Sequence, residues 1–247
     1  MRNVKLLLEY DGTNYSGWQK QENGITVQGE LEKSLKIIIG QETVLTGAGR
    51  TDRGVHAKGQ VANFKTSADI SAEKIKSGMN GTLPRDIRVL ASEDVDEEFD
   101  SRRSAVERHY GYKIIRRATA LERHFAHRLE IDLNVSEMNS AAKFIMTQKD
   151  FNSFCKATSE TENKKCHVLK SVWNEYDDFL YYTIRADRFL HHMVRSLVGT
   201  MIEIGSGKIG IEDFKLIFEK SDRRAAGPTA PAHGLYLEKV VYANYTT

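Results

Sequence analysis

The chain has 247 residues, of which 40% are hydrophobic and 28% charged, with a formal net charge of +2. This composition is typical of a globular protein that buries its own core, and it excludes a disordered chain or a small fold that depends on disulfides. The nearly balanced charge does not by itself indicate a nucleic-acid partner.

The first half of the chain shows alternating strand and helix signals. Residues 5–10 are strand-like and end at the turn signal Asp11-Gly12. A helix is predicted between Thr26, a suitable N-cap, and Gly40, because apolar residues recur there at helical spacing. Further along, the patterns predict a strand at 60–64, a helix that Ser71 caps and a strand at 86–91.

The second half repeats this order of elements. His109–Ile115 alternates in polarity and places Tyr110, Tyr112 and Ile114 on one face of a strand. A hairpin is expected around the turn Asp177-Asp178. The other predicted elements are its two strands at 168–176 and 179–186, helices at 139–148, 188–203 and 210–219, and a closing strand at 234–242.

Together these elements predict an α+β fold with two halves, residues 1–105 and 106–247. Strands mixed with one-sided helices favour antiparallel sheets with the helices on the outside. A sheet with one open face is a common platform for RNA. The acidic run at 91–100 is followed by a basic stretch at 102–128, which indicates either a surface for a polyanion or two solvated faces of opposite sign.

Segment 46–57, with the sequence TGAGRTDRGVHA, holds the densest set of chemically active residues. Its three glycines allow tight turns, and they flank Arg50, Asp52 and Arg53. The glycine spacing fits neither a Walker loop nor a dinucleotide-binding fingerprint. A carboxylate between guanidinium groups stays ionised, as a nucleophile requires. Taken alone, the same residues also suit a turn with a local salt bridge.

This segment resembles the GRTDxGVHA signature of the TruA family of tRNA pseudouridine synthases. Four other blocks of that family have counterparts in the same order along the chain, and together they make the resemblance specific. These blocks are Tyr10–Gln19 with Thr26–Leu31 after it, Arg108–Tyr112, Phe189–Arg195 and Gly227–Leu237.

The resemblance implies a role for each matching residue. Asp52 would be the catalytic nucleophile, and Arg195 would pair with it and keep it charged. Tyr110 would stack on the target uracil and is a candidate for proton removal at C5. Leu235 would pack beneath the base, and Arg50 would help to hold the target nucleotide out of its stack. The implied fold joins two RRM-like (ferredoxin-like) halves into a pseudouridine synthase fold.

The resemblance also implies a substrate: uridines at positions 38–40 in the anticodon stem-loop of tRNA, modified without a cofactor by a homodimer. Arg53 and His191 depart from the family pattern, which has a small residue and Arg at these positions, and this leaves the choice of uridines open. The candidate RNA contacts are Arg102, Arg103, Arg108, Arg116, Arg117 and Arg128.

Three other functions remain to be weighed. A paralogue that modifies ribosomal RNA would share the chemistry, and a non-catalytic RNA-binding protein would need the basic surface but not Asp52. A small-molecule glycosidase is disfavoured, because it normally uses two carboxylates and the matching blocks contain one.

Cys155, Cys166 and His167 provide too few ligands for a zinc site, so free thiols are expected. The sequence shows neither a signal-peptide pattern nor an apolar stretch long enough for a membrane span, so we expect a cytoplasmic protein.

Overall fold

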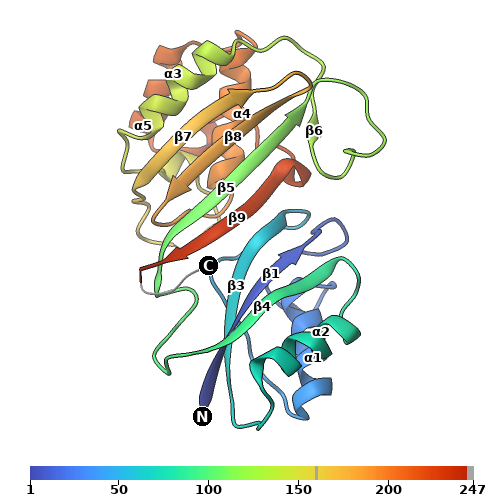
Figure 1. Ribbon diagram of the computed structural model, residues 1–247. Coiled ribbons are helices and arrows are strands. Elements are labelled where there is room, and N and C mark those ends of the chain that lie inside the picture. Colours follow the sequence, from blue (N-terminus) through green and yellow to red (C-terminus); the bar gives the residue numbers. More distant parts are fainter. Residues whose placement is uncertain (159–160, 244–247) are drawn as a thin grey trace. The chain divides into compact units, whose positions relative to one another are not determined.

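Two units make up the part of the chain that the computed structural model describes, residues 1–158 and 161–243 (Figure 1). The first unit contains Met1–Val106 and the C-terminal residues from Tyr236 onward, and the second contains Glu107–Leu235. The expected halves assigned the whole C-terminus to the second one. The closing strand instead belongs to the first unit, because it pairs there with a strand from the N-terminal part.

The first unit is built on an antiparallel sheet in the order β4-β1-β3. Its register is set by pairs such as Leu6 with Ala62 and Leu6 with Ser92. A short strand, β2, lies antiparallel to β3, and β9 pairs parallel to β3 where His56 faces Tyr236. The strands are β1 (Arg2–Tyr10), β2 (Thr46–Gly47), β3 (His56–Thr66), β4 (Ile87–Val95) and β9 (Leu235–Tyr242).

Two helices, α1 (Val27–Ile39) and α2 (Ala72–Thr82), lie side by side against this sheet (Figure 1). The predicted caps are confirmed: Thr26 and Ser71 each accept a hydrogen bond from the first turn of their helix. Gly40 ends α1 in the left-handed conformation that glycine adopts without strain. The core lies between sheet and helices, where Val4, Leu6 and Leu8 of β1 meet Leu31 and Leu35 of α1 and Ile75 and Met79 of α2, all fully buried.

The second unit has an antiparallel sheet in the order β5-β8-β7, with β6 parallel to β5. Alternate residues of β8 from Leu180 to Ala186 are fully buried, as the predicted hairpin requires. The strands are β5 (Ala105–Ile115), β6 (His127–Arg128), β7 (Val168–Glu175) and β8 (Phe179–Ala186). The helices are α3 (Val135–Ile145), α4 (Met193–Gly205), α5 (Ile211–Lys220) and the short 3-10 helices η1 (Asn152–Phe154), η2 (Arg223–Ala225) and η3 (Ala232–Gly234).

Two predicted helix boundaries are wrong. The helix expected at 188–203 begins only at Met193, because His192 has a left-handed φ of 66° and the carboxylate of Asp187 accepts the amides of His167 and Arg188. The helix expected at 139–148 is α3, which begins earlier because Asn134 caps it.

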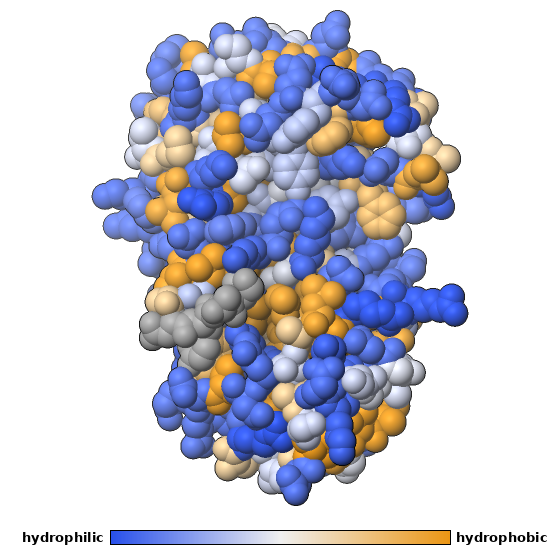
Figure 2. Space-filling model, in the orientation of Figure 1, coloured by the Kyte–Doolittle hydropathy of each residue, from blue (hydrophilic) through white to orange (hydrophobic). Residues whose placement is uncertain are grey.

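Hydrophilic side chains predominate on the face of each unit that is in view (Figure 2). Hydrophobic groups are scattered among them, and some large apolar side chains such as Ile37, Val44 and Leu121 are exposed. In the described residues, no helix combines the length and the apolar character that a membrane crossing requires.

Candidate functional site

Asp52 lies in the loop that connects β2 to β3, within a tight turn. The amide of Val55 donates to the carbonyl of Asp52 at 3.1 Å, which closes a four-residue turn. Gly54 occupies the third position of this turn with a φ of 78°, a conformation that costs glycine little and most other residues considerably more. The glycine after Arg53 is therefore required by the shape of the loop. Asp52 is half-buried and Arg50 is exposed.

The residue before Asp52 anchors the loop to the core of the first unit. The carbonyl of Thr51 accepts a hydrogen bond of 3.1 Å from the amide of Trp18. The hydroxyl of Thr51 lies 2.8 Å from the hydroxyl of Tyr10. Gly17 allows this approach, since a Cβ on it would lie 2.7 Å from the carbonyl oxygen of Thr51. Tyr10 and Trp18 are 4% and 2% exposed, so the backbone beside Asp52 rests on rigid neighbours.

Trp18 also supports the start of the loop. A Cβ on Gly47 would come within 2.5 Å of the Trp18 indole, so the strand before the loop lies directly on this ring. Trp18 and Tyr15 could stack on RNA bases only if their rings were accessible. Both are buried, and Tyr15 donates to the carboxylate of Asp86. Both rings therefore pack in the core, and Trp18 also holds the loop.

His56 fastens the end of the loop, a role that the sequence did not indicate. Its ring is buried, and its Nδ1 accepts the amide of Gly12 at 3.0 Å and lies 3.1 Å from a carboxylate oxygen of Asp11. A Cβ on Gly12 would lie 2.0 Å from the carbonyl oxygen of Val55, so the turn after β1 lies directly against the loop that carries Asp52. His56, Asp11 and Gly12 therefore together hold the end of the loop in place.

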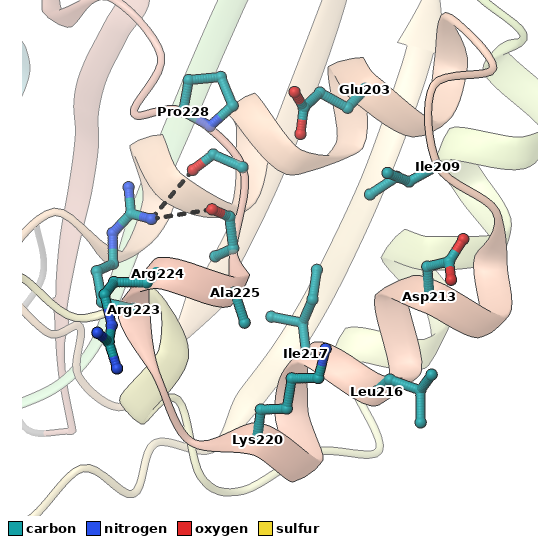
Figure 3. Close-up of a pocket in the computed structure, with 12 residues that line it drawn as sticks. Glu203, Ile209, Asp213, Leu216, Ile217, Lys220, Arg223, Arg224, Ala225 and Pro228 are labelled. Carbon is teal, nitrogen blue, oxygen red and sulfur yellow. Dashed lines mark hydrogen bonds between the residues drawn. The ribbon is translucent and has the colours of Figure 1, made fainter.

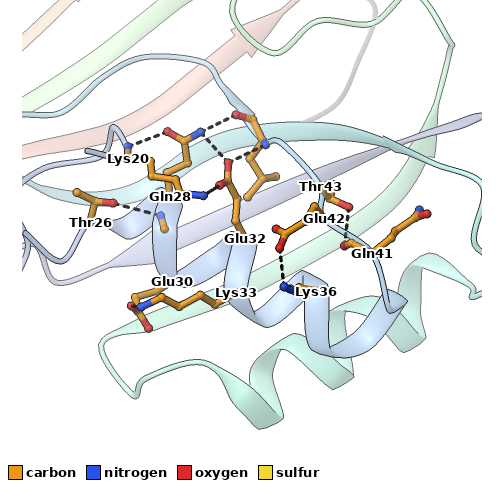
Figure 4. Close-up of polar contacts among 12 residues, drawn as sticks. Lys20, Thr26, Gln28, Glu30, Glu32, Lys33, Lys36, Gln41, Glu42 and Thr43 are labelled. Atoms are coloured by element: carbon orange, nitrogen blue, oxygen red, sulfur yellow. Dashed lines mark hydrogen bonds and ion pairs between the residues drawn. The ribbon is translucent and has the colours of Figure 1, made fainter. Parts of the chain in front are cut away.

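A buried polar network on α1 fixes the residues that lead into the loop (Figure 4). The carboxylate of Glu32, 6% exposed, accepts the amide of Leu45 at 3.2 Å and the side-chain amide of Gln28 at 2.9 Å. Gln28 in turn donates to the carbonyl of Leu45. Lys20 closes the network through an ion pair with Glu32 at 2.9 Å. The network ties the segment after Trp18 and the start of β2 to the same helix.

Tyr110 lies on β5 of the second unit, as the alternating pattern predicted. It pairs with Ile184 of β8 and is 8% exposed. Its ring meets that of Phe189 edge-on, with ring centroids 5.0 Å apart, which restricts its orientation.

Arg195 projects from the first turn of α4 and is half-buried. Its Nε donates to the carbonyl of Ala230 at 2.8 Å, and its own carbonyl accepts the amide of Ala230 at 3.0 Å. Leu235, 5% exposed, follows a few residues later at the start of β9. The same short segment of chain therefore contacts Arg195 and leads to Leu235.

Tyr112 is a further member of this region that the sequence did not identify as functional. Its hydroxyl donates to the carbonyl of Pro231 at 2.9 Å, and a Cβ on Gly234 would lie 2.7 Å from its ring. Burial raises the pKa of Tyr112 well above its usual range, although the charge of Arg195 acts in the opposite direction. The phenol therefore stays protonated and available as a donor.

His127 lies beside Tyr112 and His233, with ring centroids 6.2 and 6.4 Å away. Burial, with a smaller contribution from His233, lowers its pKa to about 4. It is therefore neutral at physiological pH. Among the described residues, its Nδ1 is buried without a hydrogen-bond partner.

The basic residues expected to contact RNA differ in their surroundings. Three of them already pair with carboxylates at 2.7–2.8 Å: Arg116 with Glu175, Arg117 with Asp178, and Arg128 with Glu130. Arg108 donates to the carbonyl of Asp187, whereas Arg102 and Arg103 are exposed in the turn that follows Asp100.

Cys155 and Cys166 are both buried, and His167 is exposed. Burial raises the pKa of the Cys166 thiol to about 12. A thiol must lose its proton to bind a metal, so this environment disfavours a metal site. Lys164 lies 3.6 Å from the sulfur of Cys155.

The expected site residues are divided between the units: Asp52 and Arg50 are in the first, and Tyr110, Arg195 and Leu235 are in the second. In each unit, hydrogen bonds and packing hold the residues beside Asp52 and Arg195 in place. The pairing of Asp52 with Arg195 and the individual catalytic roles stay predictions.

Comparison with known proteins gives consistent matches along the chain. A family model described as tRNA pseudouridine synthase matches residues 7–102 and 141–243, which include all the expected site residues except Tyr110. Proteins named tRNA pseudouridine synthase A from Thermoanaerobacter sp. (strain X514) and Clostridium acetobutylicum are each 42% identical over 244 residues, and one from Caldicellulosiruptor saccharolyticus is 41% identical. Each match covers 98% of this chain and 100% of the relative. The chain therefore belongs to the tRNA pseudouridine synthase family.

Proposed function

We propose that this chain is an enzyme that isomerises uridine to pseudouridine in tRNA, at uridines of the anticodon stem-loop. The observation that carries the proposal is the end-to-end match to relatives named tRNA pseudouridine synthase A. The supported loop around Asp52 is consistent with it, because a nucleophile needs a fixed position.

The reaction breaks the bond between N1 of uracil and C1′ of ribose, turns the base, and joins C5 to C1′. C5 loses a proton and N1 gains one, so the product is an isomer of the substrate. No electrons are exchanged with another molecule, and the balance therefore requires no co-substrate. The base must first leave its stack, because its reacting atoms are inaccessible inside a stem.

Asp52 would act on C1′, either by direct attack or by assisting departure of the base through a glycal intermediate. Arg195 would keep the carboxylate ionised and limit the cost of its burial. Tyr110 would stack on the detached uracil and is the candidate to accept the C5 proton. Leu235 would close the pocket beneath the base and keep water from the sugar. Arg50 would hold the backbone of the flipped nucleotide.

The first test measures tritium release from tRNA that carries tritium at C5 of uridine, together with tRNA binding. Asp52→Ala and Asp52→Asn should abolish release and retain binding. Asp69→Asn, which removes an exposed carboxylate of the same unit, is the matched control and should keep both. Release by Asp52→Ala would disprove the role of Asp52. Binding without release by the unchanged protein would favour a non-catalytic RNA-binding protein.

The second test maps pseudouridine in RNA from cells with and without the gene. Loss of pseudouridine from the anticodon stem-loop of tRNA alone is the expected result. Loss from ribosomal RNA alone would overturn the choice of substrate and leave the chemistry intact.

We also propose that the protein acts in the cytoplasm as a homodimer. The support for both is the resemblance to the family. Sedimentation should give twice the mass of 28.0 kDa, and cell fractionation should recover the protein with cytoplasmic tRNA. A monomer with full activity would contradict the assembly.

A further inference from the structure

The segment Ala226–Pro231 crosses α4 and is here called the strap. It begins after η2 and ends at η3, and it belongs with α4 to the second unit. Within the strap, the carbonyl of Ala230 accepts a hydrogen bond from the Nε of Arg195. The position of the strap therefore determines where one edge of the Arg195 guanidinium lies.

The strap lies unusually close to α4. A Cβ on Gly199 would come within 1.8 Å of the carbonyl oxygen of Pro228, so only glycine allows this approach. The amide of Gly227 donates to the hydroxyl of Thr200 at 3.0 Å. These contacts hold one side of the strap against the helix.

The other side of the strap borders a cavity of about 600 Å³ (Figure 3). Residues 225–228 form one wall, and Ile217 and Leu216 of α5 form another. Because this space separates the strap from α5, close packing does not fix the strap there. Hydrogen bonds must provide the restraint on this side.

Arg223 provides it. Its Nη1 donates to the carbonyls of Ala226 and Gly227 at 3.3 and 3.1 Å, and its Nη2 donates to the hydroxyl of Thr229 at 2.8 Å. A guanidinium has donors in a fixed planar arrangement, which suits simultaneous bonds to several acceptors of one turn. The bonds stop one residue before Ala230, which holds Arg195.

We propose that Arg223 is a positioning residue for the isomerisation: it fixes the strap, the strap fixes the carbonyl of Ala230, and this carbonyl orients Arg195. The proposal rests on the proposed function, because it assumes that Arg195 serves Asp52. Arg223 itself touches no reacting atom. Its removal should leave tRNA binding intact and lower the rate of the chemical step.

The experiment compares Arg223→Gln with Arg224→Gln. Arg224 is the matched control, since it lines the same cavity but its side chain is exposed and pairs only with Asp222 in the described structure. We expect Arg223→Gln to lower kcat roughly 10- to 100-fold with little change in KM, as small misplacements of catalytic groups do. Arg224→Gln should have the kcat of the unchanged protein. Equal kcat values for the two variants would overturn the proposal.

A double-mutant cycle with Arg195→Lys separates positioning from general destabilisation. If Arg223 acts through Arg195, the loss caused by Arg223→Gln should largely disappear when Arg195 is already Lys. If the double variant instead shows the product of the two single losses in kcat, Arg223 has an independent structural role and the proposal is refuted. Full activity of Arg195→Lys and of Arg195→Gln would instead disprove the assumed role of Arg195. Product formed by Asp52→Ala would disprove the proposed function itself.

Discussion

Glu32 allows a strong test of how the first unit supports the loop that carries Asp52. Replacing it by alanine removes the carboxylate that accepts the side-chain amide of Gln28 (Figure 4) and the backbone amide of Leu45. The amide of Leu45 then loses its acceptor in a buried position, whereas the side chain of Gln28 keeps its bond to the carbonyl of Leu45. Lys20, whose side chain is 60% exposed, returns to water.

The size of the effect follows from these separate losses. A buried donor without a partner costs about 1–3 kcal/mol, and the lost bond from Gln28 to a charged acceptor adds about 1.5 kcal/mol. The ion pair with Lys20 contributes less than about 1 kcal/mol, because it is largely exposed. We therefore expect Glu32→Ala to lower the free energy of unfolding of the first unit by about 3 kcal/mol. Glu30→Ala is the control, since it removes a carboxylate of the same helix that pairs with exposed Lys33, and it should cost less than about 1 kcal/mol.

The two tryptophans make the assay specific to one unit. Trp18 lies in the first unit and Trp173 in the second, and both are buried. Urea unfolding followed by fluorescence in a Trp173→Phe background therefore reports on Trp18 and the first unit. The urea midpoint of Glu32→Ala should fall well below that of Glu30→Ala. Equal midpoints would show that the network does not stabilise the unit.

Gly54→Ala should lower kcat and reduce the free energy of unfolding by about 1 kcal/mol, because alanine is strained at a φ of 78°. A kcat equal to that of the unchanged protein would contradict the need for glycine in this turn. His127→Phe should reduce the acid sensitivity of unfolding. A folded pKa of about 4 means that only the unfolded chain is protonated between about pH 6.5 and 4, so stability falls as pH decreases through this window. Between about pH 7 and pH 5 the free energy of unfolding should fall by about 1–2 kcal/mol less in the variant than in the unchanged protein, allowing for the partial exposure of His127. Urea midpoints at both pH values would measure this difference. Gly199→Ala should displace the strap at Pro228, and it should lower kcat with a smaller effect on KM. Tritium release at saturating tRNA would measure kcat, and an unaltered value would contradict the close approach of the strap to α4.

Local patterns were sufficient for most elements of the fold. The helix between Thr26 and Gly40 was predictable because its caps and its apolar spacing agree. The start of α4 was not predictable, since Leu190 continues the apolar spacing of Met193 and Leu197 backward by one turn. Contacts of Asp187 with a distant backbone amide determine the conformation there, and no local signal reports them.

The candidate site was predictable only in part, for a similar reason. Asp52 and Arg195 were named because the chain resembles a family in separate blocks. The restraints on them are mostly bonds to backbone atoms far along the chain, such as Arg195 to Ala230 and Trp18 to Thr51. A backbone carbonyl has no side-chain signature, so a sequence does not reveal which one a side chain will bind. Arg223 was overlooked on the same grounds.

The placement of β9 has a consequence for the order in which the protein forms during synthesis. All residues of the second unit are made before the chain reaches Tyr236, and at that point the first unit still lacks a strand. Until β9 is made, the edge of β3 near His56 lacks its partner strand directly after the loop that carries Asp52. The surroundings of Asp52 are therefore completed only after β9 is made, when Tyr242 donates its hydroxyl to the carbonyl of Ser101.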